Sequence, residues 1–324
     1  MRRSILGAAC CAALVMFATV GCSANPPASQ AAATAPPAAP SALPNTGPSS
    51  APSIEPSLAP TAEPTPMVDP AIPTYAEFDA SRFSNGAAIT NVWMPLQPGR
   101  RWITEGVTIE GGERIPHKIS FTVTSLTKVI AGVKTAVVWI EDISDGVVVE
   151  KEIAFYAQDD DGTVWYLGEH PEEYEDGEFV QAPTWIHGVE ESRAGVKMLA
   201  DPSLHTQALF QGWAPTVEWS DYGRLDEVAP EDCVRAGCYK DVVRFAESSL
   251  GEDGIYQLKS YAKGIGEIRV GWRGESDSRE ELELKAAATL SSAALARYDA
   301  LARDLEAHAY QISPKVFGGT DHSQ

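Results

Sequence analysis

Polar and apolar residues alternate with a period of two along several parts of this chain. In 119–124, isoleucine, phenylalanine and valine alternate with serine and threonine, and 267–272 follows the same pattern. This alternation predicts strands with one buried and one solvated face. The stretch 282–290 alternates too, although its Glu, Lys and Ala content leaves a helix open. Residues 136–140 are apolar at every position, which predicts a central strand covered on both faces.

Glycine-containing turns separate these stretches. Asp-Gly tolerates the positive φ angles of tight hairpins, and loops this short make neighbouring strands antiparallel. The turns are Glu110-Gly111-Gly112, Asp145-Gly146, Asp161-Gly162, Asp176-Gly177 and Asp253-Gly254.

The last predicted element is a helix over 292–310. Apolar residues fall there at spacings of three and four, a serine precedes it, and Pro314 follows. A meander of about ten strands accumulates twist and curls or closes. We therefore expect a mainly β fold: a curved antiparallel sheet or open barrel with this C-terminal helix packed on it. The helical stripe is Leu295, Tyr298, Ala302, Leu305 and Ala309.

The N-terminus has a different composition. Two arginines and an apolar run lead to Thr19-Val20-Gly21-Cys22, which resembles a bacterial lipoprotein signal. The resemblance implies that 1–21 is a signal peptide and that Cys22 carries lipid. Thr19 stands where such signals more often have leucine, so an ordinary secretory signal cut near Ala24 is the alternative.

A tether is predicted over 22–73. Fourteen of the 51 residues from Ser23 to Pro73 are proline, and all eight tryptophans come later. Such a segment cannot bury a core and should be disordered and extended. We expect the antiparallel β domain to occupy 74–313 and a C-terminal tail to occupy 314–324.

The formal net charge of −20 argues against nucleic-acid partners and against electrostatic docking on anionic lipids. Membrane attachment is therefore expected through N-terminal acyl chains, at the outer face of a bacterial membrane. Beyond the signal and Cys22, only Cys233 and Cys238 remain, an even pair that predicts a disulfide in an exported protein. The alternative is two separately buried cysteines.

No catalytic residue, cofactor or metal site is predicted. The chain has neither a Gly-x-Ser-x-Gly nor a His-Glu-x-x-His string. Asp159-Asp160-Asp161-Gly162 lacks the closing glutamate of an EF-hand, and 264–269 lacks the third glycine of a dinucleotide loop. The acidic loop 169–178 is expected to be solvated, with a divalent ion as the alternative.

Aromatic residues supply the candidate ligand contacts. Tryptophans can line a ligand groove or pack a core, and alternation places several of them on buried faces. His187 is flanked by apolar residues and could be a base or a ligand if a carboxylate lay beside it, or else a structural histidine. The candidate ligand-binding residues are Trp139, Trp165, Trp185, His187 and Trp272.

Three segments, 93–99, 132–140 and 261–266, resemble those of uncharacterised bacterial envelope lipoproteins with a half-open barrel, of which the LolA/LolB lipoprotein carriers are the described relatives. The resemblance implies a concave apolar surface suited to an acyl chain, and it brings no catalytic residues. We expect a non-enzymatic, membrane-anchored envelope lipoprotein that binds a lipid or another apolar ligand. The alternatives are a module that recognises a protein or wall polymer and, third, a wall-directed hydrolase.

Overall fold

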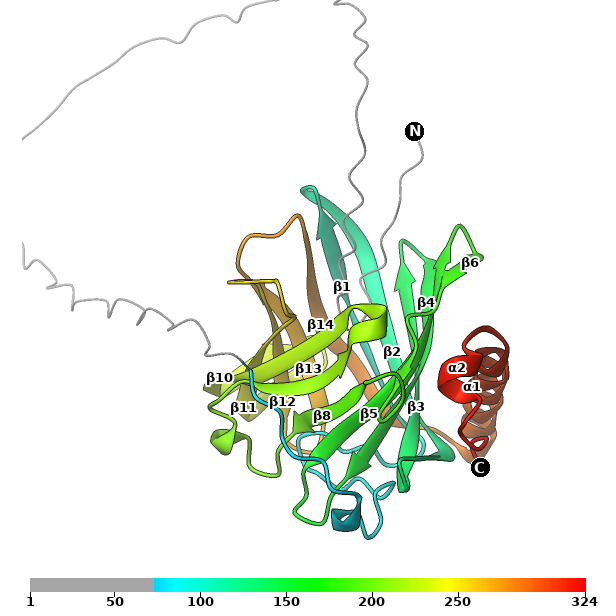
Figure 1. Ribbon diagram of the computed structural model, residues 1–324. Helices are drawn as coiled ribbons and strands as arrows, with labels where there is room; N and C mark the ends of the chain where they lie inside the picture. Colours follow the sequence, from blue (N-terminus) through cyan, green and yellow to red (C-terminus); the bar gives the residue numbers. More distant parts are fainter. Residues whose placement is uncertain (1–72) are drawn as a thin grey trace, which may run out of the picture. The chain divides into compact units, whose positions relative to one another are not determined.

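The computed structural model describes residues 73–324, so the predicted signal, Cys22 and almost all of the tether lie outside the described residues. Strands dominate this part of the chain, with one long helix beside them (Figure 1). The strands are β1 (Arg100–Glu110), β2 (Glu113–Ile130), β3 (Val133–Ser144), β4 (Val147–Gln158), β5 (Val164–Glu175), β6 (Glu178–Gln181), β7 (Trp185–Ile186), β8 (Arg193–Met198), β9 (Leu209–Ala214), β10 (Trp219–Val234), β11 (Gly237–Ser248), β12 (Tyr256–Ala262), β13 (Gly266–Arg273) and β14 (Ser278–Thr289).

The strands form one antiparallel sheet that closes on itself. Its order is β4-β3-β2-β1-β14-β13-β12-β11-β10-β9-β8-β5, and β4 also pairs with β5. Twelve strands therefore make a barrel, and β6 and β7 are short additions to β5. The predicted mainly β fold with a C-terminal helix is confirmed, and the strand pairing closes the barrel all the way round.

Hairpin turns fall where glycine allows them. Asp145 and Gly146 turn between β3 and β4 with φ angles of 49° and 80°, and Asp176 and Gly177 do the same between β5 and β6. Both residues of such a turn need positive φ, which explains the Asp-Gly pairs. Residues 282–289 belong to β14, so the strand predicted from the alternation in 282–290 is confirmed up to 289 and the helical alternative is wrong.

Helix α1 (Ser292–Ile312) packs against the outer face of β2, β3 and β4. Ser291 caps it by accepting a hydrogen bond from the backbone N–H of Ala294. The apolar residues between the sheet and the C-terminal helices are called the outer core. Its largest buried members are Trp139, Ile153, Phe155, Trp165, Leu167, Leu305 and Phe317.

The segment expected to be a tail is packed. It forms α2 (Pro314–Phe317), which buries Phe317 completely. Beyond α2, Gln324 pairs with Thr127 of β2 through two backbone hydrogen bonds of 2.9 and 3.0 Å. The C-terminal residues therefore extend the cover that α1 places over the outer face.

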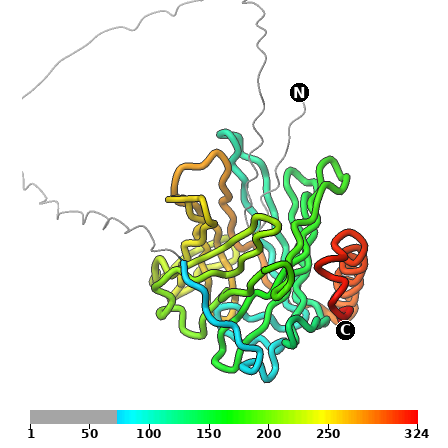
Figure 2. The backbone as a smooth tube through the Cα atoms, in the orientation of Figure 1, coloured from blue at the N-terminus to red at the C-terminus, as the bar shows by residue number. Residues whose placement is uncertain are grey.

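Residues 73–99 precede the barrel and cross its lower end, drawn in cyan in Figure 2. They contain one 3₁₀ turn, η1 (Ala80–Arg82); two more, η2 (Pro202–Leu204) and η3 (Pro215–Val217), lie near β9. Ile89, Trp93 and Leu96 are buried among the apolar side chains inside the barrel, which are called the inner core. We call 89–99 the plug.

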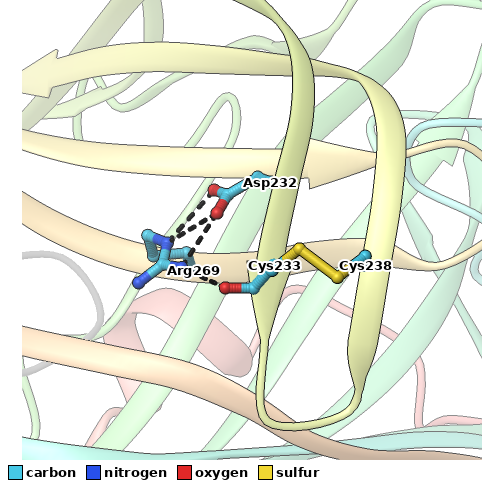
Figure 3. The surroundings of a disulfide bond; sticks show 4 residues. All are labelled: Asp232, Cys233, Cys238 and Arg269. Carbon is cyan, nitrogen blue, oxygen red and sulfur yellow. Dashed lines mark hydrogen bonds and ion pairs between the residues drawn. A yellow bond between two sulfur atoms is a disulfide. The ribbon is translucent and has the colours of Figure 1, made fainter.

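A disulfide joins Cys233 and Cys238, as predicted, between opposite residues of the β10–β11 hairpin (Figure 3). Arg269 of β13 donates hydrogen bonds to Asp232 and to the backbone oxygen of Cys233, the latter at 2.7 Å. The hairpin tip is also held by a 3.0 Å backbone hydrogen bond from Ala236 to Leu284 of β14. The disulfide is therefore one of several contacts that hold this hairpin.

Candidate functional site

A cavity of about 60 Å³ lies inside the barrel, beside the plug. One water molecule needs roughly 10–15 Å³ of such volume, so the cavity accommodates a group the size of a few waters. Eight of its lining residues are apolar and come from the plug, from β1 to β3 and from the β12–β13 turn. They are Met94, Pro95, Leu96, Trp102, Phe121, Val138, Ile140 and Ile265.

The apolar wall is held by aromatic stacking. Trp102 and Phe121 lie opposite each other in the β1–β2 register and stack with ring centroids 5.1 Å apart and an interplanar angle of 9°. Tyr156 and Tyr166 form a second stack, at 4.6 Å, on the β4–β5 side. Stacked rings have few alternative positions, so this wall is preorganised for an apolar group.

The opposite side of the cavity is polar and carries two buried lysines, Lys197 of β8 and Lys259 of β12. Both ammonium groups bind Glu247 of β11, with Nζ to Oε2 distances of 3.2 and 2.9 Å. Burial by itself would raise the pKa of Glu247, but the two lysine charges outweigh it and lower that pKa to about 2. Gln211 donates a further hydrogen bond to Glu247 at 2.8 Å.

Two more carboxyl groups, Glu152 and Glu169, meet on the β4–β5 side. Burial and the neighbouring Glu169 raise the pKa of Glu152 well above its usual range. Burial also raises the pKa of Glu169, against the effect of hydrogen bonds from the Tyr166 hydroxyl and from the Trp185 indole N–H. A raised pKa favours the protonated form of a carboxyl group, and that form can donate a hydrogen bond.

These groups give the cavity a definite polarity. Its polar side holds Lys197 and Lys259, paired with the ionised Glu247, and Glu152, whose pKa is raised well above its usual range by burial and by Glu169. Burial raises the pKa of Glu267, another lining residue, as well. A ligand with an apolar body against the Trp102 wall and an acidic group near the lysines would match both sides.

The structure does not bring the predicted ligand contacts together, and none of them lines the cavity. Trp185 is in the inner core, stacked on Trp219 at 4.8 Å. Trp139 and Trp165 are in the outer core, because their positions in β3 and β5 point away from the barrel interior. Trp272 is half-buried near the end of β13.

His187 lies outside the inner core, half-buried beyond β7. Its Nδ1 accepts a 3.0 Å hydrogen bond from the backbone N–H of Ala194, and its ring packs edge-on against Phe78. Burial lowers its pKa, and no carboxylate within residues 73–324 forms a hydrogen bond or ion pair with it. These contacts agree with the structural alternative.

The acidic stretch 169–178 belongs mostly to β5 and its hairpin with β6 and is not a solvated loop. Glu169, His170 and Glu172 are buried, because this part of β5 lies between the barrel interior and the C-terminal helices. Glu172 accepts hydrogen bonds from Tyr174 and from His308 of α1. The cluster is spread over both faces of the strand.

Sequence reasoning missed the residues that make the polar side. The available signal was a charged residue on the same face of a strand as apolar ones, as at Glu152, which alternates with Ala154 and Tyr156 in 147–158. A charge at an inward position of such a strand needs a buried partner. That signal does not identify the partner, which here lies on another strand.

No protein family and no curated protein matches this chain. A solved structure described as a "putative lipoprotein" from Parabacteroides distasonis is similar at 10% sequence identity and a TM-score of 0.30, covering 61% of this chain and 99% of that chain. Within residues 73–324, every helix is too short or too polar to cross a bilayer.

Proposed function

We propose that this protein is a non-enzymatic lipoprotein of the bacterial envelope, whose barrel binds an apolar ligand with an acidic end. The anchoring part rests on the signal-like sequence Thr19-Val20-Gly21-Cys22, and the non-enzymatic part rests on the lack of hydrolase strings. The proposed ligand rests on the cavity, which is lined by apolar residues such as Trp102 and by the charged residues Lys197 and Lys259.

Charge supports an acidic end group over a neutral one. Lys197 and Lys259 both pair with Glu247, and a ligand carboxylate beside them would gain from the two ammonium groups. Glu152, with its raised pKa, could donate a hydrogen bond to the same group. Burying each methylene of the ligand contributes about 0.8 kcal/mol, so affinity should rise with chain length while the chain fits.

Cavity size limits that chain. About 60 Å³ holds only a short chain, so a long acyl chain would have to displace the plug, 89–99. Moving the plug would break several hydrogen bonds to the barrel, among them those from Gly264 N–H to the Val92 oxygen at 2.7 Å and from Gly99 N–H to the Val123 oxygen at 2.8 Å. Binding of a long-chain lipid therefore requires the plug to move, whereas a short acid binds while the plug stays in place.

The test uses residues 23–324 produced without the predicted signal and without detergent. Butyrate, octanoate and myristate are titrated against the alcohols of the same lengths, with tryptophan fluorescence as the readout, since Trp102 lines the cavity. We expect saturable quenching of tryptophan fluorescence, and we expect each acid to bind with higher affinity than the alcohol of the same length. Hydrogen exchange at 89–99 should rise with myristate and stay unchanged with butyrate.

Lys259→Met should remove the preference for acids over alcohols, because the variant loses one of the two cavity ammonium groups. Lys285→Met is the matched control, since Lys285 lies on the outer face of β14 with its side chain 53% exposed. If folded protein binds no member of the series saturably, the cavity is not a site for this class of ligand. The interaction module is then the better proposal.

The anchor is tested separately with Cys22→Ala in the full chain. We expect it to lose incorporation of labelled palmitate while the barrel stays folded. Incorporation of the label at the wild-type level would show that Cys22 is not the lipidated residue.

A further inference from the structure

Three side chains with metal-ligating atoms meet inside the barrel, and none of them lines the cavity. They are His117 of β2, Asp142 of β3 and Glu280 of β14, with exposed fractions of 4%, 1% and 2%. One ligand atom from each lies within 4.8 Å of the others. No second group of this kind occurs in residues 73–324.

The sheet order brings the three strands together, since β1 lies between β2 and β14 and β3 lies on the other side of β2 (Figure 1). In the β2–β3 register Asp142 is diagonal to His117 and points to the same face. On β1, Gly106 stands opposite His117 and lets the backbone of β14 approach closely at Glu281, while Thr108 stands opposite Glu280.

The groups around the three side chains orient them. His117 Nε2 lies 2.6 Å from Asp142 Oδ1, and Nδ1 lies 2.5 Å from the Thr108 hydroxyl and 3.3 Å from Glu280 Oε1. Gln257 donates a 2.8 Å hydrogen bond to the other oxygen of Glu280. Metal-binding histidines and carboxylates are usually held by such outer partners, which fix the ring and the carboxylate plane.

The cluster also has more carboxylate oxygens than donors. Asp142 Oδ2 is buried and has no hydrogen-bond partner within residues 73–324, and the buried Glu280 Oε1 makes no hydrogen bond there either, its nearest charged group being His117 Nδ1 at 3.3 Å. Glu150 stands opposite Asp142 in the β3–β4 register, and its Oε2 is buried without such a partner as well. Buried oxygens of this kind are rare in folded proteins, and one imidazole cannot satisfy all three. A cation bound among these three oxygens would satisfy them.

We propose that His117, Asp142 and Glu280 bind a divalent transition-metal ion, with Glu150 as the candidate fourth ligand. One imidazole nitrogen together with carboxylate oxygens suits Zn²⁺ and Mn²⁺, whereas Ca²⁺ and Mg²⁺ prefer oxygen alone. The ion would join β2, β3 and β14 from within the barrel. This site is independent of the ligand proposed for the cavity.

The test uses the full chain, purified in detergent and treated with a chelator. ZnCl₂, MnCl₂ and CaCl₂ are titrated by calorimetry, and the metal content of protein purified without chelator is measured by mass spectrometry. We expect one Zn²⁺ or Mn²⁺ for each chain and no saturable binding of Ca²⁺. A wild-type chain that binds neither Zn²⁺ nor Mn²⁺ saturably would overturn the proposal and leave an imidazole–carboxylate ion pair.

His117→Gln and Asp142→Asn keep the size of the side chains and remove ligands. Each should weaken binding by more than about 100-fold, because losing only an outer partner already costs 10–100-fold. His205→Gln is the matched control: it removes another buried histidine, which has no hydrogen-bonded carboxylate in the described residues. If folded His117→Gln protein binds the metal with wild-type affinity, the metal binds elsewhere and the assignment of this site is wrong.

A second measurement needs no variant, in case the substitutions prevent folding. Co²⁺ added to the wild-type chain should give visible absorption bands of a low-symmetry nitrogen and oxygen site, and Zn²⁺ should abolish them. A spectrum identical to that of aqueous Co²⁺ would contradict a site made by His117, Asp142 and Glu280.

Discussion

The inner and outer faces of the barrel differ in chemistry although the same strands make both. In β4, Glu152 and Tyr156 point inward, whereas Ile153 and Phe155 point outward toward the C-terminal helices. The outer core is mainly apolar, and the ionisable groups buried beside it are paired. Lys128 and Glu306 lie 2.8 Å apart and bind further groups of the C-terminal residues, and Glu172 pairs with His170 and with His308 of α1.

The inner core buries ionisable groups that a purely structural core would avoid. Carboxyl groups such as Glu152 and Asp221 have pKa values raised mainly by burial, for Asp221 to about 7, so the fold holds them at a free-energy cost. Apolar replacements of such groups are often neutral or stabilising. The outer face therefore stabilises the protein mainly by apolar packing, and the inner face carries the buried charges on which the proposed binding of an acidic ligand depends.

The largest effect is expected in the outer core. Phe317 is completely buried between Phe155, His170 and Tyr310, so Phe317→Ala should lower the free energy of unfolding by roughly 3–5 kcal/mol. Urea denaturation followed by circular dichroism measures the change. Val129→Ala, at a position 44% exposed on β2, is the control and should change the free energy by less than about 0.5 kcal/mol. Equal losses would contradict the assigned role of α2.

The next effect depends on pH and belongs to the inner face. Burial lowers the pKa of His205 to about 4, so between pH 6.5 and 4 the unfolded chain binds a proton there that the folded chain does not. Stability should therefore fall as pH falls through this window. The total loss is about 3 kcal/mol, since one pKa unit corresponds to about 1.4 kcal/mol.

Denaturation curves at several pH values measure that loss, and the difference between wild type and His205→Gln isolates it from the other titrating groups. The variant should have a flatter profile between pH 6.5 and 4 and the same profile above pH 7. Parallel profiles over the whole range would show that His205 is not buried as a neutral imidazole.

A smaller effect of opposite sign tests the specialisation of the inner face. Replacing Lys197 and Lys259 with Met, and Gln211 and Glu247 with Leu, removes a hydrogen-bonded ionic network and leaves apolar groups of similar size. The free energy of unfolding should stay unchanged or rise by about 1–3 kcal/mol. The same variant should lose the preference for acids over alcohols. A large destabilisation would mean that the network is structural.

The architecture of the barrel was largely predictable from the sequence, because it rests on local signals. Alternation in 119–124, the Asp-Gly turns and the stripe in 292–310 each report on residues a few positions apart. What they cannot report is closure, which depends on β5 pairing with both β4 and β8.

The candidate site was not predictable in the same way, because its contacts span long separations. Lys197 and Glu247 are fifty residues apart, and His117 and Glu280 lie on strands joined only through β1. Period-two patterns place a residue on a face but do not say which face is the interior. The sequence therefore predicts Trp139 and Trp165 as ligand contacts, although both belong to the outer core.

The smallest effect is expected at the disulfide of the β10–β11 hairpin. Replacing Cys233 and Cys238 with serine opens a ring of six residues. The unfolded chain then regains conformational entropy, which should lower the free energy of unfolding by about 2 kcal/mol at most. Arg269 still binds Asp232 and the backbone of residue 233, so the hairpin should keep its place (Figure 3). Denaturation of the reduced wild type should match that of the serine variant.

Neither cysteine lines the cavity, so the binding of short acids should be unchanged. Weaker binding in the serine variant would show that the hairpin helps to shape the inner face, and the separation between a binding interior and a stabilising exterior would then fail at β10 and β11.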